Sequence, residues 1–184
     1  VDRNSSLIEI KPITSCNLDC IYCSVDQSRR LVDFVVEEEY LFEELKDLVE
    51  YKAQDNIEVH IGTQGEPLIY APLVDLIKDI ASIEQVKTIS IDTNGTMLAK
   101  GKIDQMIDAG LAQFNLSINA LDQKLAEKIA GSRYDIEKIK KVLSDKNLQK
   151  DLLNFLKEHS KIFSVDEFKR KTKEIIKKFF RVKF

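Results

Sequence analysis

The stretch that decides the fold is Cys16-Asn-Leu-Asp-Cys20-Ile-Tyr-Cys23, which holds all three cysteines of the chain. Its C-x3-C-x2-C spacing lets one loop wrap three thiolates around a metal centre, and thiolates are the usual ligands of iron–sulfur clusters. Three protein ligands on a four-iron cluster leave one iron open to an exogenous chelator. A disulfide framework is not expected, because one thiol would be left over and we expect a reducing compartment.

Zinc is the alternative metal for this loop. A zinc site would need His60 or His159 as its fourth ligand. Zinc sites more often use two Cys pairs or a Cys pair with a His pair, and C-x3-C-x2-C is not their usual spacing. The spacing therefore favours the cluster and leaves zinc as the second interpretation.

Strand and helix patterns alternate on both sides of the cysteine loop. Alternation of apolar and polar residues predicts strands over 7–13, 57–61, 86–91 and 114–118. Apolar residues at helical spacing predict helices over 37–51, 73–83, 102–109 and 122–130. This pattern predicts an α/β fold, a parallel sheet with right-handed crossovers and helices packed outside it. A partial β/α barrel and a doubly wound sheet both fit.

Three short polar motifs lie at or just after the ends of the later strands. They are Gly62-Thr-Gln-Gly65-Glu66-Pro67, Asp92-Thr93-Asn94-Gly95 and Asn115-Leu-Ser117-Ile-Asn119. Each is weak alone, because Asn-Gly is ordinarily a turn and a serine in a strand ordinarily packs. The carboxyl ends of parallel strands share one face, and sites gather there. We therefore expect these motifs and the cysteine loop to converge on one crevice.

These motifs together resemble those of the radical S-adenosylmethionine superfamily. The cysteine triplet, with the aromatic Tyr22 before its third Cys, resembles the cluster motif, and Gln64-Gly65-Glu66-Pro67 resembles the Gly-Gly-Glu-Pro motif. The resemblance covers residues 7 to about 143, the first four β/α units of a six-unit partial barrel. Gln64 departs from the first Gly of the motif, and strands five and six are not visible. The chain thus resembles an incomplete, truncated barrel over 1–143.

The resemblance implies cofactors and an oxygen-sensitive chemistry. Cys16, Cys20 and Cys23 would ligate a [4Fe–4S] cluster, and the amino and carboxylate groups of S-adenosylmethionine would chelate the fourth iron. Reductive cleavage would then give a 5′-deoxyadenosyl radical that acts on an unknown substrate. The electron would come from a donor such as a flavodoxin or ferredoxin. A non-catalytic iron–sulfur or electron-transfer module of the same ancestry is the alternative.

The resemblance also implies roles for residues outside the cysteine triplet. Gly65 and Glu66 would hold the methionine amino group of S-adenosylmethionine. Ser117 and Asn94 would contact its carboxylate or ribose, and Tyr22 would lie beside the adenine through its backbone. No residue is assigned to catalysis on the substrate.

The last part of the chain, 144–184, differs from the rest. It carries 12 Lys and Arg against 6 Asp and Glu in a chain of net charge −3. Helical spacing is found over 135–143, 148–158 and 166–180, and no strand is expected after residue 143. We expect this basic helical tail to pack on the incomplete barrel or on a second chain without rebuilding the missing strands. A solvated Lys-rich face is favoured over contact with nucleic acid such as RNA.

The sequence also predicts where the protein is found. No apolar run approaches the roughly 18–20 residues that span a bilayer. The first residues, Val1 to Ser6, contain no apolar signal segment. These features predict a cytoplasmic protein without a membrane partner.

Overall fold

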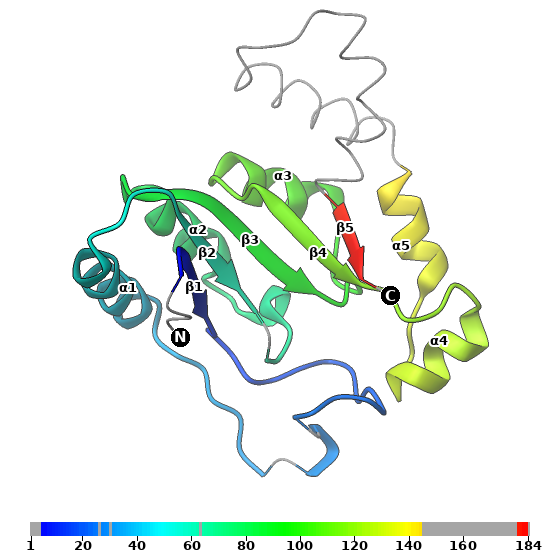
Figure 1. The fold of residues 1–184 in the computed structure, drawn as a ribbon. Coiled ribbons are helices and arrows are strands. Elements are labelled where there is room, and N and C mark those ends of the chain that lie inside the picture. The colour runs from blue at the N-terminus through cyan, green and yellow to red at the C-terminus, as the bar shows by residue number, and fades with distance from the viewer. Residues whose placement is uncertain (1–4, 26, 30, 63, 145–179, 184) are drawn as a thin grey trace, which may run out of the picture.

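The computed structural model describes residues 5–25, 27–29, 31–62, 64–144 and 180–183 (Figure 1). Within them, one sheet has the strand order β1-β2-β3-β4-β5, and every neighbouring pair is parallel. The strands are β1 (Leu7–Ile10), β2 (Ile57–Ile61), β3 (Val86–Thr93), β4 (Gln113–Ser117) and β5 (Phe180–Lys183). The first four follow one another in space as they do in the sequence, as successive β/α units require.

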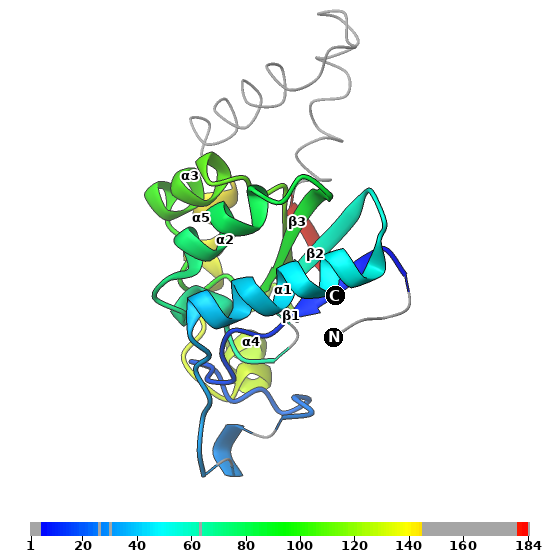
Figure 2. The ribbon, with the colours of Figure 1, turned by 90° about the vertical axis from the view of Figure 1, so that its left-hand side faces the viewer.

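Helices connect the strands and lie on one side of the sheet. They are α1 (Glu38–Lys52), α2 (Leu73–Ala81), α3 (Lys100–Asp108), α4 (Gln123–Ala130) and α5 (Ile136–Leu143), with short 3-10 turns η1 (Gln27–Arg29) and η2 (Pro67–Ile69). Figure 2 shows α1, α2 and α3 together against one face of the sheet. The predicted α/β alternation is therefore confirmed, with boundaries that differ by a few residues.

The two faces of the sheet have opposite character. One face is buried under the helices and is apolar: Ile8, Ile10, Ile57, Val59, Ile61, Ile89, Ile91, Phe114 and Leu116. Burying each such side chain contributes roughly 1.5–3 kcal/mol. The opposite face carries the polar residues of the same strands: Glu9, Glu58, His60, Ser90, Asp92, Gln113 and Asn115. A sheet with helices on its apolar side and a polar concave side is the wall of a partial barrel.

The strand β5 corrects the prediction for the tail. The sequence predicts a helix through residue 180 and no strand after 143, whereas Phe180–Lys183 pairs in parallel with β4. Four residues, Phe-Arg-Val-Lys, directly after a helical pattern give too short a strand signal to detect. These residues form a strand because the outer edge of β4 offers backbone N–H and C=O groups that pair with another strand. The prediction that the tail adds no strand is therefore wrong.

The remaining tail predictions concern residues outside the described part of the chain. The predicted helix over 148–158, nearly all of that over 166–180, and His159 lie outside the described residues. Within the described ranges, no helix has the length and apolar character that a membrane span requires.

Candidate functional site

The cysteine loop lies at the carboxyl end of the sheet and is docked on the end of α4. The backbone N–H of Asp19 donates to the carbonyl of Ala130 (2.9 Å), and that of Ile21 donates to the carbonyl of Ile129 (3.0 Å). These carbonyls belong to the last turn of a helix, which lacks partners of its own. Gly131 follows with φ +61°, and a Cβ atom there would collide with the Asp19 carbonyl oxygen. The close approach therefore requires glycine at this position.

The three thiols share one partly buried loop. The N–H of Cys23 donates to the carbonyl of Cys20 (2.9 Å), which closes a tight turn between these two residues. Burial raises the pKa of Cys16, and the nearby charges of Glu66 and Cys20 raise it further. Burial also raises the pKa of Cys20, and the charge of Cys23 adds to this. The thiols therefore lie close enough to affect one another.

This donor set fits an iron–sulfur cluster in its chemistry. Three thiolates on one loop are the ligands that such clusters use, and no disulfide joins them. In the parts of the chain that the structure describes, no three His, Cys, Asp or Glu side chains are already gathered at metal-binding distances.

Glu66 lies just before η2 and is 1% exposed. Its Oε1 accepts hydrogen bonds from Thr93 Oγ1 (2.6 Å) and from the N–H of Leu68 (3.1 Å), and its Oε2 accepts from the N–H of Asn94 (2.7 Å). Burial raises the pKa of this carboxyl group, although these donors, and the charge of Lys102, act in the opposite direction. Glu66 therefore ties the loop after β2 to the loop after β3.

Gly65 brings the same loop against the segment that leads to the cysteines. It has φ +69°, and a Cβ atom there would lie 2.6 Å from the carbonyl oxygens of Ile13 and Ser15. The N–H of Glu66 donates to the carbonyl of Ser15 at 2.8 Å. The glycine of the predicted motif thus permits a backbone contact between the two loops.

Asn94 completes the connection to the cysteine loop. Its Nδ2 donates to Asn17 Oδ1 (2.9 Å) and lies 3.8 Å from Cys16 Sγ. Asn17 in turn donates to Thr96 Oγ1 (2.7 Å), and the N–H of Thr96 donates to Asn94 Oδ1 (3.0 Å). A continuous set of hydrogen bonds therefore runs from Cys16 through Asn94 to Glu66.

Tyr22 and Ser117 lie on the β4 side of the site. The Tyr22 hydroxyl accepts a hydrogen bond from Asn119 Nδ2, and the Tyr22 side chain remains 56% exposed. Ser117 is the last residue of β4. The hydroxyl of Tyr134 donates to the carbonyl of Asn94 and also lies within hydrogen-bond distance of the carbonyl of Ser117. All the residues named for cofactor binding thus occur on loops or strand ends at one end of the sheet. Their contacts with a cofactor remain predictions.

The sequence motifs do not reveal two residues that build this site. Gly131 and Tyr134 lie between α4 and α5, where no recognised motif occurs. An isolated glycine after a helix predicts only a helix end. An isolated tyrosine predicts only packing, so no local signal identifies either position.

His60 bears on the zinc alternative. Its Nδ1 lies 2.8 Å from Ser90 Oγ and its Nε2 lies 3.2 Å from Asp92 Oδ2, both on the polar face of the sheet. Ser90 also donates to Glu58 Oε1 (3.2 Å). Both ring nitrogens of His60 therefore have partners on β3, and His60 does not join the three cysteines as a fourth ligand.

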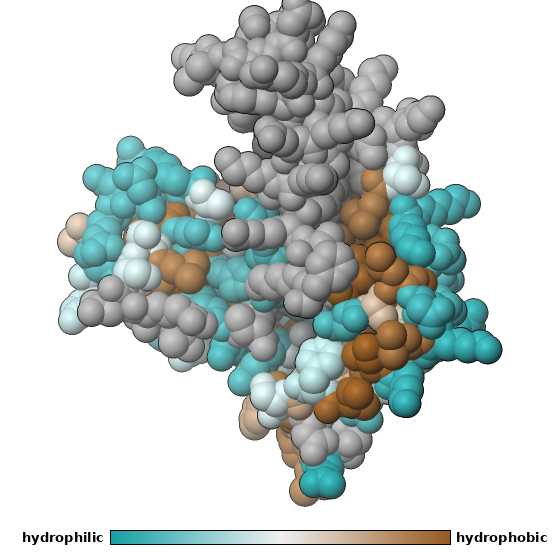
Figure 3. All heavy atoms as spheres, turned by 45° about the vertical axis from the view of Figure 1, so that its right-hand side comes forward, coloured by the Kyte–Doolittle hydropathy of each residue, from teal (hydrophilic) through white to brown (hydrophobic). Residues whose placement is uncertain are grey.

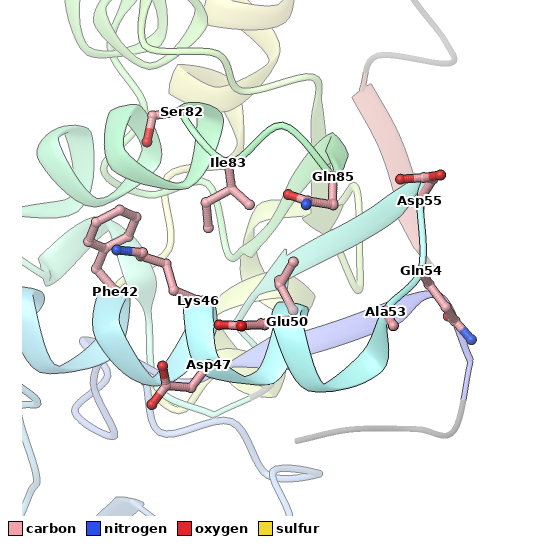
Figure 4. A pocket seen from close by; sticks show the side chains of 11 residues that line it. Phe42, Lys46, Asp47, Glu50, Ala53, Gln54, Asp55, Ser82, Ile83 and Gln85 are labelled. Atoms are coloured by element: carbon pink, nitrogen blue, oxygen red, sulfur yellow. The ribbon is translucent and has the colours of Figure 1, made fainter.

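A hollow lies away from the motif loops, and an apolar surface lies beside the cysteine loop. A hollow of about 720 Å³ lies between α1, the end of α2 and the residues before β2 and β3 (Figure 4). This is the amino end of those strands, opposite the motif loops. On another side, Figure 3 shows apolar surface over α4 and α5. The exposed residues Leu121, Leu125, Ile21 and Tyr22 place apolar surface next to the cysteine loop.

Comparison with known proteins places this geometry in a family. The family model described as "Radical SAM superfamily" matches residues 10–145. "Uncharacterized protein MJ0103" of Methanocaldococcus jannaschii is 43% identical over 146 residues, which are 76% of this chain and 34% of that protein. "GTP 3',8-cyclase" of Trichormus variabilis is 34% identical over 132 residues, 68% of this chain and 38% of that enzyme. The chain thus spans between a third and two fifths of these relatives.

Solved structures share the fold at low sequence identity. The chain matches BtrN in complex with AdoMet and 2-DOIA with a TM-score of 0.58 and 20% identity, over 82% of this chain and 56% of BtrN. It matches native anSMEcpe with bound AdoMet with a TM-score of 0.59 and 17% identity, over 96% of this chain and 43% of that one. With the family match and the joined motif loops, these findings show that the chain belongs to the radical S-adenosylmethionine superfamily, which uses a [4Fe–4S] cluster and S-adenosylmethionine.

Proposed function

We propose that this chain forms the cofactor-binding part of a radical enzyme that reductively cleaves S-adenosylmethionine. When bound, the cluster and S-adenosylmethionine supply a 5′-deoxyadenosyl radical that takes a hydrogen atom from a substrate. The observation that carries the proposal is the hydrogen-bonded set from Cys16 through Asn94 to Glu66. It joins three separate sequence motifs at the carboxyl end of one parallel sheet, where sites of such folds lie.

In this proposal the residues of the chain have distinct tasks. Cys16, Cys20 and Cys23 would hold the cluster, and its position without a protein ligand would be open to the amino and carboxylate groups of S-adenosylmethionine. Because the Glu66 carboxylate already accepts three hydrogen bonds from the protein, its main task is to position Asn94 and the backbone around Gly65. That backbone would then receive the methionine amino group.

Ser117 and Tyr22 would act on the adenosine side of the site. Ser117, at the end of β4, and Asn94, directly after β3, would contact the carboxylate or ribose. Tyr22 would lie beside the adenine through its backbone while Asn119 holds its hydroxyl.

The proposal extends to the substrate and the reductant in less detail. The name of a 34% identical relative, a GTP 3',8-cyclase, makes GTP the first compound to test. That relative is longer than the segment it shares with this chain, so cleavage of S-adenosylmethionine is measured both with and without GTP. The reductant would be a small protein such as a flavodoxin or ferredoxin.

The deciding experiment measures S-adenosylmethionine cleavage. Protein reconstituted without oxygen and reduced with dithionite is expected to bind about four irons per chain and to form 5′-deoxyadenosine, with and without GTP. The Ser117→Ala variant should keep its iron but bind S-adenosylmethionine more weakly. Iron bound without any 5′-deoxyadenosine would favour the electron-transfer module over the enzyme. A wild-type protein that binds neither iron nor S-adenosylmethionine would refute the proposal.

A further inference from the structure

Tyr134 lies in the turn between α4 and α5 with only 4% of its surface exposed. Its hydroxyl donates to the backbone carbonyl of Asn94 at 2.9 Å and also lies 3.3 Å from the carbonyl of Ser117. These carbonyls belong to the ends of two neighbouring strands, β3 and β4. One buried hydroxyl group therefore sets the spacing between two residues that the proposed function places on S-adenosylmethionine.

Tyr134 is itself held from several sides. Its carbonyl accepts a hydrogen bond from Gln123 Nε2 (2.7 Å), and Gln123 Oε1 accepts one from the N–H of Ile136 (3.3 Å). Gly131, three residues earlier, lies directly under the cysteine loop. The same turn thus contacts the cysteine loop on one side and the strand ends on the other.

The hydroxyl of Tyr134 remains a donor at neutral pH. Burial raises the pKa of Tyr134 to about 12, and the nearby charges of Cys20 and Glu66 act in the same direction. The group therefore keeps its proton under all ordinary conditions. The ring is buried and the hydroxyl hydrogen-bonds to main-chain oxygens, so the hydroxyl acts as a hydrogen-bond donor to the backbone.

We propose that Tyr134 is a positioning residue for S-adenosylmethionine, which holds the ends of β3 and β4 at the separation that the bound cofactor requires. The inference rests on the proposed function, because it assumes that Asn94 and Ser117 contact the cofactor. Tyr134 would touch neither the cluster nor the substrate. It would act through the main chain of Asn94 and Ser117.

The chain offers a matched control for this proposal. Tyr70 is 1% exposed, its hydroxyl donates to a backbone carbonyl, that of Val36, at 2.8 Å, and burial raises its pKa to about 12. The variants Tyr134→Phe and Tyr70→Phe therefore each delete one buried hydroxyl and its carbonyl bond. They keep the ring and its packing. Only the first deletion involves the two strand ends.

The test measures affinity and turnover in reconstituted protein. Tyr134→Phe is expected to bind S-adenosylmethionine about tenfold more weakly than wild type, the effect of one lost hydrogen bond that orders a binding loop. Its iron content should equal that of wild type. The KM for S-adenosylmethionine in 5′-deoxyadenosine formation should rise by the same factor, with the maximal rate little changed. Tyr70→Phe should leave affinity and KM at wild-type values.

A second measurement needs no cofactor. In cluster-free protein, the backbone amides of Gly95 and Ile118 follow the two carbonyls, so their NMR resonances should shift in Tyr134→Phe and not in Tyr70→Phe. Wild-type affinity in Tyr134→Phe, or equal losses in the two variants, would overturn the inference and leave the proposed function intact. A wild-type protein that binds no S-adenosylmethionine would overturn both.

Discussion

Two loops of the candidate site, one around Glu66 and one around the three cysteines, are held in different ways. Glu66 is 1% exposed, and its two carboxylate oxygens accept three hydrogen bonds from the protein. The cysteine loop is docked on α4 through backbone bonds at Asp19 and Ile21 and contacts the loop after β3 through Asn17, and the side chain of Ile21 is 73% exposed. The carboxylate of one loop is fully paired within the fold, whereas the three thiols of the other loop are only partly buried.

The difference indicates what each loop needs in order to work. Buried polar groups with all their partners rigidify a site before any ligand arrives. Partly exposed thiols gain their full set of partners only when metal binds, so that part of the site depends on its cofactor. We therefore expect changes in the cysteine loop to affect cluster binding with little loss of stability. Changes at Glu66 should affect stability first.

The largest expected effect is the loss of the cluster from the cysteine variants. Each of Cys16→Ala, Cys20→Ala and Cys23→Ala should reduce bound iron from about four per chain to a trace, because three thiolates are the only protein ligands proposed. Thermal unfolding of the cluster-free protein should change little, because none of the three thiols is fully buried. Iron analysis and the visible spectrum provide the measurement.

The neighbouring Ser24 provides the control for these variants, since Ser24→Ala alters an exposed side chain of the same loop. This variant should keep its iron. Zinc as the sole metal in anaerobically prepared wild type would contradict the prediction, as would a full iron content in any of the three cysteine variants.

The next effect tests the anchor of the cysteine loop. In Gly131→Ala the added methyl group collides with the Asp19 carbonyl, at a residue whose φ of +61° also disfavours alanine by about 1 kcal/mol. The loop must move away from α4, and we expect at least half of the bound iron to be lost on reconstitution. Gly101→Ala is the matched control. It lies in the first turn of α3 with nothing within 4 Å of the new methyl group, and it should stabilise the protein by less than about 1 kcal/mol.

If Gly131→Ala binds iron as wild type does, the docking of the loop on α4 is not needed for the cluster. The comparison between the loops would then change. The thiols would organise around the metal without help from the rest of the fold.

Much of the fold and the identity of the motif loops follow from the sequence. The strand at 57–61 matches β2 to the residue, because Ile57, Val59 and Ile61 alternate with Glu58 and His60 and all three are fully buried. The motif loops meet because parallel strands put their carboxyl ends on one face. Periodicity and topology are thus enough to place Glu66, Asn94 and Ser117 at the same end of the sheet.

The sequence does not predict how these residues contact one another. Asn94 and Cys16 are 78 positions apart, and their contact depends on how far each loop extends beyond its strand. The role of Tyr134 depends on a turn that carries no motif. The sequence does not predict β5, because a four-residue segment is too short to show a strand pattern. These residues form a strand only because the edge of β4 is available for pairing.

The third effect is on stability. Glu66→Ala removes the acceptor for the N–H groups of Leu68 and Asn94 and for the hydroxyl of Thr93. Leaving buried donors without partners costs about 1–3 kcal/mol each before relaxation, so we expect a net loss of about 3 kcal/mol in the free energy of unfolding. Urea unfolding of the cluster-free protein measures it. Glu43→Ala, at an exposed position of α1, should change it by less than about 0.5 kcal/mol. Equal stability of the two variants would show that the Glu66 network is not structural.

The smallest effect concerns the charge of Glu66 and tests whether burial or hydrogen bonding controls it. Burial raises the pKa of this carboxyl above its ordinary value of 4.5, even though three protein donors favour the ionised form. In the pH range between the unfolded and the raised folded pKa, the folded protein binds more protons than the unfolded chain. The contribution of Glu66 to stability is therefore fully present below about pH 4.5 and is lost as the pH rises through the folded pKa.

Because glutamine does not titrate, the difference in unfolding free energy between wild type and Glu66→Gln isolates this contribution from that of every other group. Measured by urea unfolding at successive pH values from 4 upward, the stability advantage of wild type should decrease with pH. An advantage that grows with pH would mean that the donors outweigh burial and that this loop is built around a fixed negative charge.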